Sequence, residues 1–225
     1  MSITTSSTGS ARGVKRALIL SLVVASTACG WSNKTKGTGI GATAGGAAGA
    51  VIGKQTGSTA RGAIIGAVVG GAAGAIIGHQ MDQQAKELEM AIPGAVVERV
   101  GEGLVVTFAS GLLYDFDSDA IRPDAAQNLN NLAASLQKYT NTELLIVGHT
   151  DDVGAADYNQ ALSTRRASSA ARYLTMQGVA GSRIHVSGKG EMEPVSSNDT
   201  ESGRQANRRI EVAIYAAAAE ATGSR

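Results

Sequence analysis

Residues 144–167 (LLIVGHTDDVGAADYNQALSTRRA) have the pattern of a buried strand, a polar loop and the first half of a helix. The apolar run at 144–147 is typical of a strand covered on both faces, and Gly148 ends it. The polar residues 149–152 therefore follow the carboxyl end of that strand, where open sheets tend to place ligand sites. The stretch predicts an α/β arrangement with a candidate site in this loop.

Three residues of the predicted helix share one face, because Asn159, Leu162 and Arg166 are spaced i, i+3 and i+7. Asp151 in the loop and Arg166 on the facing helix would together hold the two ends of a zwitterion. The Asp carboxylate would take an ammonium group, and the guanidinium would take a carboxylate bidentately. On these residues alone, a structural ion pair between loop and helix is the commoner explanation.

Together with a later motif, this stretch resembles the OmpA-like peptidoglycan-binding module, which also occurs in the peptidoglycan-associated lipoproteins. The matching motifs are GHTD at 148–151, YNQALSTRRA at 158–167 and GRQANRRIEVAI at 203–214. The resemblance covers roughly residues 104–215, about half of the chain. It implies an α+β fold, in which a βαβαβ module has a mixed sheet with helices packed on it.

The resemblance also implies site residues. In the family, the Asp of the TD pair and the Arg of the LSxxRA motif grip the diaminopimelate side chain of the cell-wall stem peptide, and these are Asp151 and Arg166 here. Asn159 and Leu162 would then be walls of the site, although Leu162 also suits the core.

Three further positions match the family pattern. Phe116 and Asp117 match the FDS segment beside the pocket, and Phe116 is more typical of a core residue. Arg208 matches the first Arg of the NRR motif. It shares the strand parity of Ile210, so it is expected to point inward and to need an acid or a carbonyl. A structural role and a ligand contact are equally compatible with Arg208.

The N-terminal residues 1–28 have the pattern of a secretory signal, with basic residues, a 12-residue apolar run and small residues at the end. That run is too short to cross a bilayer as a helix. Cys29, the single cysteine, stands at the expected cleavage point and predicts an acylated lipoprotein. The alternative is a plain secretory signal with an unmodified Cys29, because Ser26 stands where Leu is common in lipoproteins. Residues 29–36 form a polar spacer.

An internal repeat follows, since GGAAGAVIGKQ at 45–55 matches GGAAGAIIGHQ at 70–80. Around these matches, glycines stand at every fourth position from Gly37 to Gly53 in the first copy and from Gly62 to Gly78 in the second, which places the five glycines of each copy on one helical face. Because glycine costs about 1 kcal/mol per position in a helix, the pattern favours close backbone approach, as in GxxxG helix pairs. Residues 37–80 are therefore predicted to form a glycine-zipper helical hairpin. Residues 37–53 would span about 25 Å against a bilayer core of about 30 Å, so the pattern favours association of the hairpin with a membrane over a full span. The alternatives are a flexible Gly/Ala linker and a soluble packed hairpin.

Residues 81–94 are predicted as a linker helix that Pro93–Gly94 ends and separates from the module at 95–215. Within the module, AVVERV and LVVTF predict a hairpin. The spacing of Leu129, Leu132 and Leu136 predicts the buried stripe of a helix. Residues 216–225 are expected to be a flexible tail.

Charge and motifs exclude several classes of function. With 20 basic and 19 acidic residues, the chain shows no footprint for nucleic acid. Three histidines without HxxxH or HExxH spacing, and no GxSxG, predict neither a metal site nor a catalytic one, and no cofactor is expected.

The sequence thus predicts a non-catalytic envelope lipoprotein that is lipid-anchored at the periplasmic face of the outer membrane and binds peptidoglycan. One alternative is a glycine-zipper membrane protein that forms a homo-oligomer, with the module as a passive wall anchor. The other is a cell-wall hydrolase.

Overall fold

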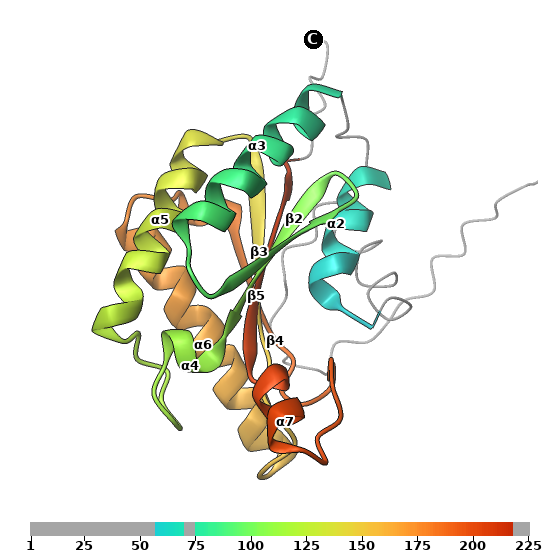
Figure 1. The fold of residues 1–225 in the computed structure, drawn as a ribbon, viewed down its shortest axis with the longest axis vertical. Helices are drawn as coiled ribbons and strands as arrows, with labels where there is room; N and C mark the ends of the chain where they lie inside the picture. The colour runs from blue at the N-terminus through green and yellow to red at the C-terminus, as the bar shows by residue number, and fades with distance from the viewer. Residues whose placement is uncertain (1–56, 70–74, 218–225) are drawn as a thin grey trace, which may run out of the picture. The chain divides into compact units, whose positions relative to one another are not determined.

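The computed structural model describes residues 57–69 and 75–217 (Figure 1). The predicted signal segment, Cys29, the spacer, the whole first glycine copy, residues 70–74 of the second copy and residues 218–225 lie outside the described residues. The helices are α2 (Thr59–Val69), α3 (Ala75–Ala91), α4 (Ser110–Leu113), α5 (Ala126–Lys138), α6 (Ala156–Met176) and α7 (Glu201–Asn207), with 3-10 turns at Pro123–Ala125 and Gly181–Arg183. The strands are β1 (Ala95–Val100), β2 (Gly103–Ala109), β3 (Thr142–Gly148), β4 (Ile184–Gly188) and β5 (Arg209–Ala216).

The strands form one mixed sheet in the order β1-β2-β5-β3-β4. The hairpin predicted from AVVERV and LVVTF is confirmed, with Val100 paired to Gly103. Strand β5 runs antiparallel to both β2 and β3, whereas β3 and β4 are parallel and joined by α6. The predicted α+β fold, a mixed sheet with helices packed on it, is confirmed.

The main core lies between one face of the sheet and the helices α3, α5 and α6, which Figure 1 shows on the same side of the sheet. Alternate residues of β5, Ile210, Val212 and Ile214, face this core and are buried. The predicted stripe of α5 is also buried there. Helix α6 is followed by Gly178 at a φ of +92°, a conformation that glycine adopts without strain and that ends helices.

The opposite face of the sheet is covered by α2 (Figure 1). Ala60 and Ile64 of α2 pack there against residues of β2, β3 and β5. A Cβ on Gly103 would lie 2.7 Å from Ile64 Cγ2 and 2.6 Å from the Ile214 carbonyl oxygen, so a glycine at the start of β2 permits this approach. Since residues of a helix are about 100° apart, the buried Gly62 and Gly66 lie on the other side of α2.

Pro93–Gly94 follows the end of α3, as predicted, but α3 shares the main core with the module. Helix α3 starts at Ala75 rather than at residue 81, and its Met81 and Leu88 belong to the main core together with Ile92. The reason is the apolar side of α3, which loses contact with water by packing on α5 and β1. The glycine-packing prediction stays a prediction, because the first copy lies outside the described residues. Within the described ranges, no helix is both long and apolar enough to cross a membrane.

Candidate functional site

The predicted loop follows β3, and two paired glycines bring α6 close to it. A Cβ on Gly148 would lie 2.2 Å from the Ser163 carbonyl oxygen, and one on its partner Gly188 would lie 2.1 Å from Thr164 Oγ1. Only glycine allows this approach. The side of α6 that bears Asn159 and Arg166 is thereby held against the loop at the carboxyl ends of the parallel strands.

Asp151 is buried, but its ionic partner is Arg208. Asp151 Oδ2 accepts a hydrogen bond of 2.5 Å from Arg208 Nη1, and Oδ1 accepts one of 3.2 Å from the Val153 amide. Arg208 Nη2 also donates to Glu201 Oε1 at 2.7 Å. The register that pairs Gly148 with Ile210 explains this contact, because it places the residue before β5 beside the loop after β3. Glu201 has a lowered pKa because it accepts hydrogen bonds from Arg208 and Arg204.

Arg208 therefore has the acidic partner that the sequence required. The prediction that Arg208 points inward is wrong, because β5 starts only at Arg209, and 31% of the Arg208 side chain is exposed. The buried arginine is its neighbour Arg209, which forms an ion pair of 2.7 Å with Glu211.

Arg166 is buried and is held by backbone oxygens. Its Nε donates to the Ser118 carbonyl at 2.8 Å and its Nη2 to the Asp115 carbonyl at 3.4 Å. The guanidinium lies 5.3 Å from the centre of the Tyr114 ring, and the Tyr114 hydroxyl donates to the Arg166 carbonyl at 2.7 Å. Burial lowers the pKa of Arg166 and raises that of Tyr114. Arginine nevertheless stays charged in proteins.

No carboxylate of the described residues lies within ion-pair distance of Arg166, and its Nη1 has no hydrogen-bond partner among them. The structural ion pair between Asp151 and Arg166, the commoner explanation from local residues, is therefore not formed. Arg166 combines a fixed orientation with a free donor. This arrangement suits the binding of an external carboxylate.

The FDS segment lies beside Arg166, but Phe116 is 96% exposed. The prediction that Phe116 belongs to the core is wrong, because the turn directs the carbonyls of Asp115 and Ser118 toward Arg166 and leaves the Phe116 side chain in solvent. Asp117 adopts a φ of +56° and accepts a hydrogen bond from the Tyr158 hydroxyl. This hydrogen bond raises the pKa of Tyr158.

Asn159 links three segments at the site. Its Nδ2 lies 3.3 Å from the Asp151 carbonyl, 3.2 Å from the Val153 carbonyl and 2.8 Å from Glu191 Oε2. Leu162 is 6% exposed, which fits the core alternative. Sequence reasoning missed Glu191, although GKGE follows β4 and the carboxyl ends of parallel strands meet at one edge.

His149 lies in the motif but faces the opposite side of the sheet. It is fully buried, and neither ring nitrogen has a hydrogen-bond partner among the described residues. Its Nε2 is 3.9 Å from Glu211 Oε2, while the two Glu211 oxygens already accept from Arg209 and Ser58. Burial lowers the pKa of His149 to about 2, so the ring is neutral.

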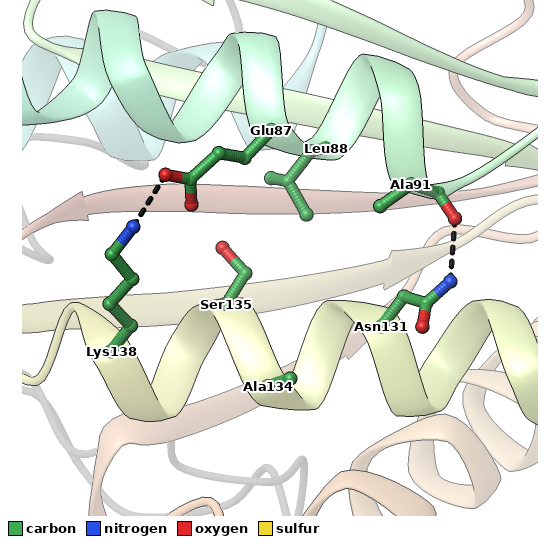
Figure 2. A pocket seen from close by; sticks show the side chains of 7 residues that line it. All are labelled: Glu87, Leu88, Ala91, Asn131, Ala134, Ser135 and Lys138. Carbon is green, nitrogen blue, oxygen red and sulfur yellow. Dashed lines mark hydrogen bonds and ion pairs between the residues drawn. The ribbon is translucent and has the colours of Figure 1, made fainter.

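A cavity of about 270 Å³ lies elsewhere, between α3 and α5. Figure 2 shows it bridged by the Lys138–Glu87 ion pair of 2.5 Å and by the 2.6 Å hydrogen bond from Asn131 to the Ala91 carbonyl. None of the predicted site residues lines it, so it is a groove between packed helices. The described His, Asp and Glu side chains form no group of three that would hold a metal ion.

Fold and site together define a small α+β module with buried charges at the carboxyl ends of β3 and β4. The OmpA family pattern matches residues 113–208, and the YMGG-like Gly-zipper pattern matches residues 12–82. The chain belongs to the OmpA family, so the predicted resemblance is confirmed, and the second match confirms a glycine-zipper segment, whose fold as a hairpin stays a prediction.

Two relatives and one solved structure illustrate the similarity. The chain is 34% identical over 129 residues to the peptidoglycan-associated lipoprotein of Agrobacterium fabrum (strain C58), covering 57% of this chain and 73% of that protein. It is 36% identical over 136 residues to the probable lipoprotein YiaD of Escherichia coli (strain K12), covering 60% and 62%. The cell wall anchor of the T6SS from Pseudomonas aeruginosa superposes with a TM-score of 0.50 at 28% identity, covering 62% and 96%. The chain spans 35–62% of the length of the first three curated relatives that it matches.

Proposed function

We propose that this chain is a non-catalytic lipoprotein of the cell envelope that tethers the outer membrane to peptidoglycan. The module at 95–215 would bind the diaminopimelate side chain of the stem peptide. Relatives named as peptidoglycan-associated lipoproteins and the likeness to a cell wall anchor support wall attachment. The observation that carries the proposal is Arg166, a buried arginine with a free Nη1 and no counter-ion among the described residues.

The two charged residues have different roles. Arg166 takes the distal carboxylate of diaminopimelate, because its fork is already oriented by two carbonyls. Asp151 takes the ammonium, which must share this carboxylate with Arg208 or displace it. Glu201 offers Arg208 a second partner and thereby lowers the cost of that displacement. Asn159 fixes the loop, while Leu162, Phe116 and Asp117 border the site.

The other end of the tether is the N-terminal region. Cys29 would carry the lipid anchor at the periplasmic face of the outer membrane, and the glycine copies would connect the anchor to the module. A relative named as an outer-membrane lipoprotein supports this location.

The test is binding of the purified full chain to sacculi, with Asp151→Ala and Arg166→Ala compared with Asp152→Ala and Arg165→Ala. The control residues are exposed neighbours of the same types. Removing either site charge should weaken binding by about 2 kcal/mol or more, roughly thirtyfold. The control variants should bind as the unchanged chain does.

Thermal melting of each variant separates binding from folding. A folded Arg166→Ala variant that binds sacculi normally would refute the role of Arg166. A free stem peptide with diaminopimelate should compete with sacculi, whereas one with Lys lacks the distal carboxylate and should compete poorly. Equal competition by the two peptides would exclude the zwitterion grip.

A further inference from the structure

The segment 188–193, which begins at the last residue of β4, contacts the candidate site at one end and α2 at the other. We propose that this segment couples ligand binding at the site to the docking of α2 on the second face of the sheet. The ligand side of the proposal rests on the proposed function. The contacts that join α2 to this segment, and the segment to the site residues, do not depend on the proposed function.

At the site end, the segment is held tightly against α6. The Gly190 amide donates to Ser163 Oγ at 2.9 Å, and the Thr150 amide donates to the Gly190 carbonyl at 2.9 Å. Gly190 has a φ of +51°, and a Cβ there would lie 3.0 Å from the Gln160 amide nitrogen. Glu191 accepts from Asn159, the residue that also fixes the carbonyls of the Asp151 loop. A ligand that orders this loop therefore also orders residues 190 and 191.

At the other end, Glu193 binds the N-terminus of α2. Its Oε2 accepts from the Thr59 amide at 2.9 Å, and its Oε1 accepts from Thr59 Oγ1 at 2.5 Å. A carboxylate at this end of a helix satisfies a free amide and interacts favourably with the helix dipole. The Glu193 side chain is only 14% exposed. The backbone carbonyl of Glu193 accepts a hydrogen bond from the buried Arg209. Glu211 of β5 adds a second carboxylate that accepts from Ser58 Oγ at 3.2 Å.

The two ends are joined by a short turn. The Met192 amide donates to the Lys189 carbonyl at 3.0 Å, and Lys189 Nζ lies 3.7 Å from Glu193 Oε1. Only Met192 separates the residue that contacts Asn159 from the residue that contacts α2. A displacement of Glu191 is therefore passed to Glu193. By thermodynamic linkage, a ligand that strengthens α2 docking must itself bind more tightly when α2 is docked.

The docking residues Ala60 and Ile64 lie at the start of the second glycine copy. At the repeat offset of 25 residues they correspond to Thr35 and Gly39 at the start of the first. The first copy therefore lacks the apolar side chain that fills the contact with Gly103. Occupation of the site would stiffen the tether where it joins the module.

The first arm of the test uses the full chain without ligand and measures amide hydrogen exchange. Ile64→Asp places a charge in the apolar contact and should release α2. Glu98→Gln is the control, because it removes only the surface pair between Glu98 and Arg61. Ile64→Asp should speed exchange at residues 159–163 and 188–193 by about fivefold or more, the lower range of measured couplings, and Glu98→Gln should not. Faster exchange in α2 with unchanged exchange at the site segments would overturn the coupling.

The second arm adds a disaccharide tetrapeptide that contains diaminopimelate. Exchange in α2 should slow by about fivefold or more in the unchanged chain and in Glu98→Gln, but not in Glu193→Ala. Binding of this muropeptide without any change in α2 exchange would refute the proposal. Coupling in the first arm together with no muropeptide binding would refute the proposed function and leave the coupling supported.

Discussion

Asp151 and Arg166 each have a partner other than the residue that the motif spacing suggests. Asp151 is neutralised by Arg208, whereas Arg166 is held by two carbonyls without a counter-ion among the described residues. The two residues thus differ in whether their charge is already paired before a ligand binds. An incoming carboxylate finds a cation with a free donor, while an incoming ammonium finds an anion that is already paired. Recognition of the carboxylate should therefore dominate the binding free energy.

The burial of the single residue His149 predicts how the stability of the chain depends on pH. Its folded pKa is about 2, below the value of about 6.5 in an unfolded chain. Between these values only the unfolded chain takes up the proton. The His149 contribution to stability is therefore fully present above pH 6.5 and is lost as the pH falls. The expected slope from this group is up to about 1.4 kcal/mol per pH unit.

The His149→Gln variant cannot titrate at this position, so its free energy of unfolding should fall less steeply between pH 6.5 and pH 5. Urea unfolding at a series of pH values measures this slope. Identical slopes for the variant and the unchanged chain would show that the buried ring does not carry the effect.

At the scale of elements, the approach of α6 to the ends of β3 and β4 positions the site. Gly148 and Gly188 are paired across the two strands, and both lie against the third turn of α6. Helix α2 approaches the other face over Gly103 in a comparable manner. The sheet is thus packed closely on both faces, by α6 at the carboxyl ends of β3 and β4 and by α2 at the opposite end of the sheet, where β2 starts. Small residues at three strand positions determine how near the helices come.

Replacing Gly148 by Ala should lower the free energy of unfolding by about 1–3 kcal/mol, because the added Cβ meets the Ser163 backbone, which cannot move aside alone. Gly111→Ala is the matched control, since a Cβ there has nothing within 4 Å. Chemical denaturation of both variants measures the difference. Equal stability of the two would contradict the close approach of α6 to β3.

At the scale of the whole molecule, the OmpA module and the preceding segments are not independent. Helix α3 completes the main core, and α2 covers the second face, so the structural unit begins well before residue 95. The second glycine copy thereby contributes to the module as well as to the connection. A fragment of residues 95–215 would expose Leu104, Val105 and their neighbours to water, and the full chain is the appropriate material for binding experiments.

The proposed lipid anchor at Cys29 leads to a prediction for the whole molecule. Cys29 should be the acylated N-terminus of the mature chain, because several acyl chains hold a protein stably on a membrane and one does not. Mass spectrometry of the mature N-terminus determines the modification. Cys29→Ser should release the chain from the outer-membrane fraction without changing the binding of sacculi by the purified protein. An unmodified Cys29, or cleavage at another residue, would contradict the lipoprotein proposal.

The sequence by itself determined the local elements and the family. The strand at 144–147 follows from its unbroken apolar run, the hairpin from two strand-like stretches around residues 101 and 102, and the stripe of α5 from the helical period of 3.6 residues. These local patterns need no tertiary information. The motifs that resemble the OmpA module likewise identified the loop and the helix that carry Asp151 and Arg166.

Only the tertiary structure decided which side chains meet. Asp151 and Arg208 are 57 residues apart, and their contact depends on the placement of β5 beside β3. The exposure of Phe116 depends on the carbonyls that Arg166 requires, and the docking of α2 depends on carboxylates from β5 and from the segment after β4. Local periodicity specifies the face of each element. The partner of that face is selected by strand order and close packing, which involve residues distant in the chain.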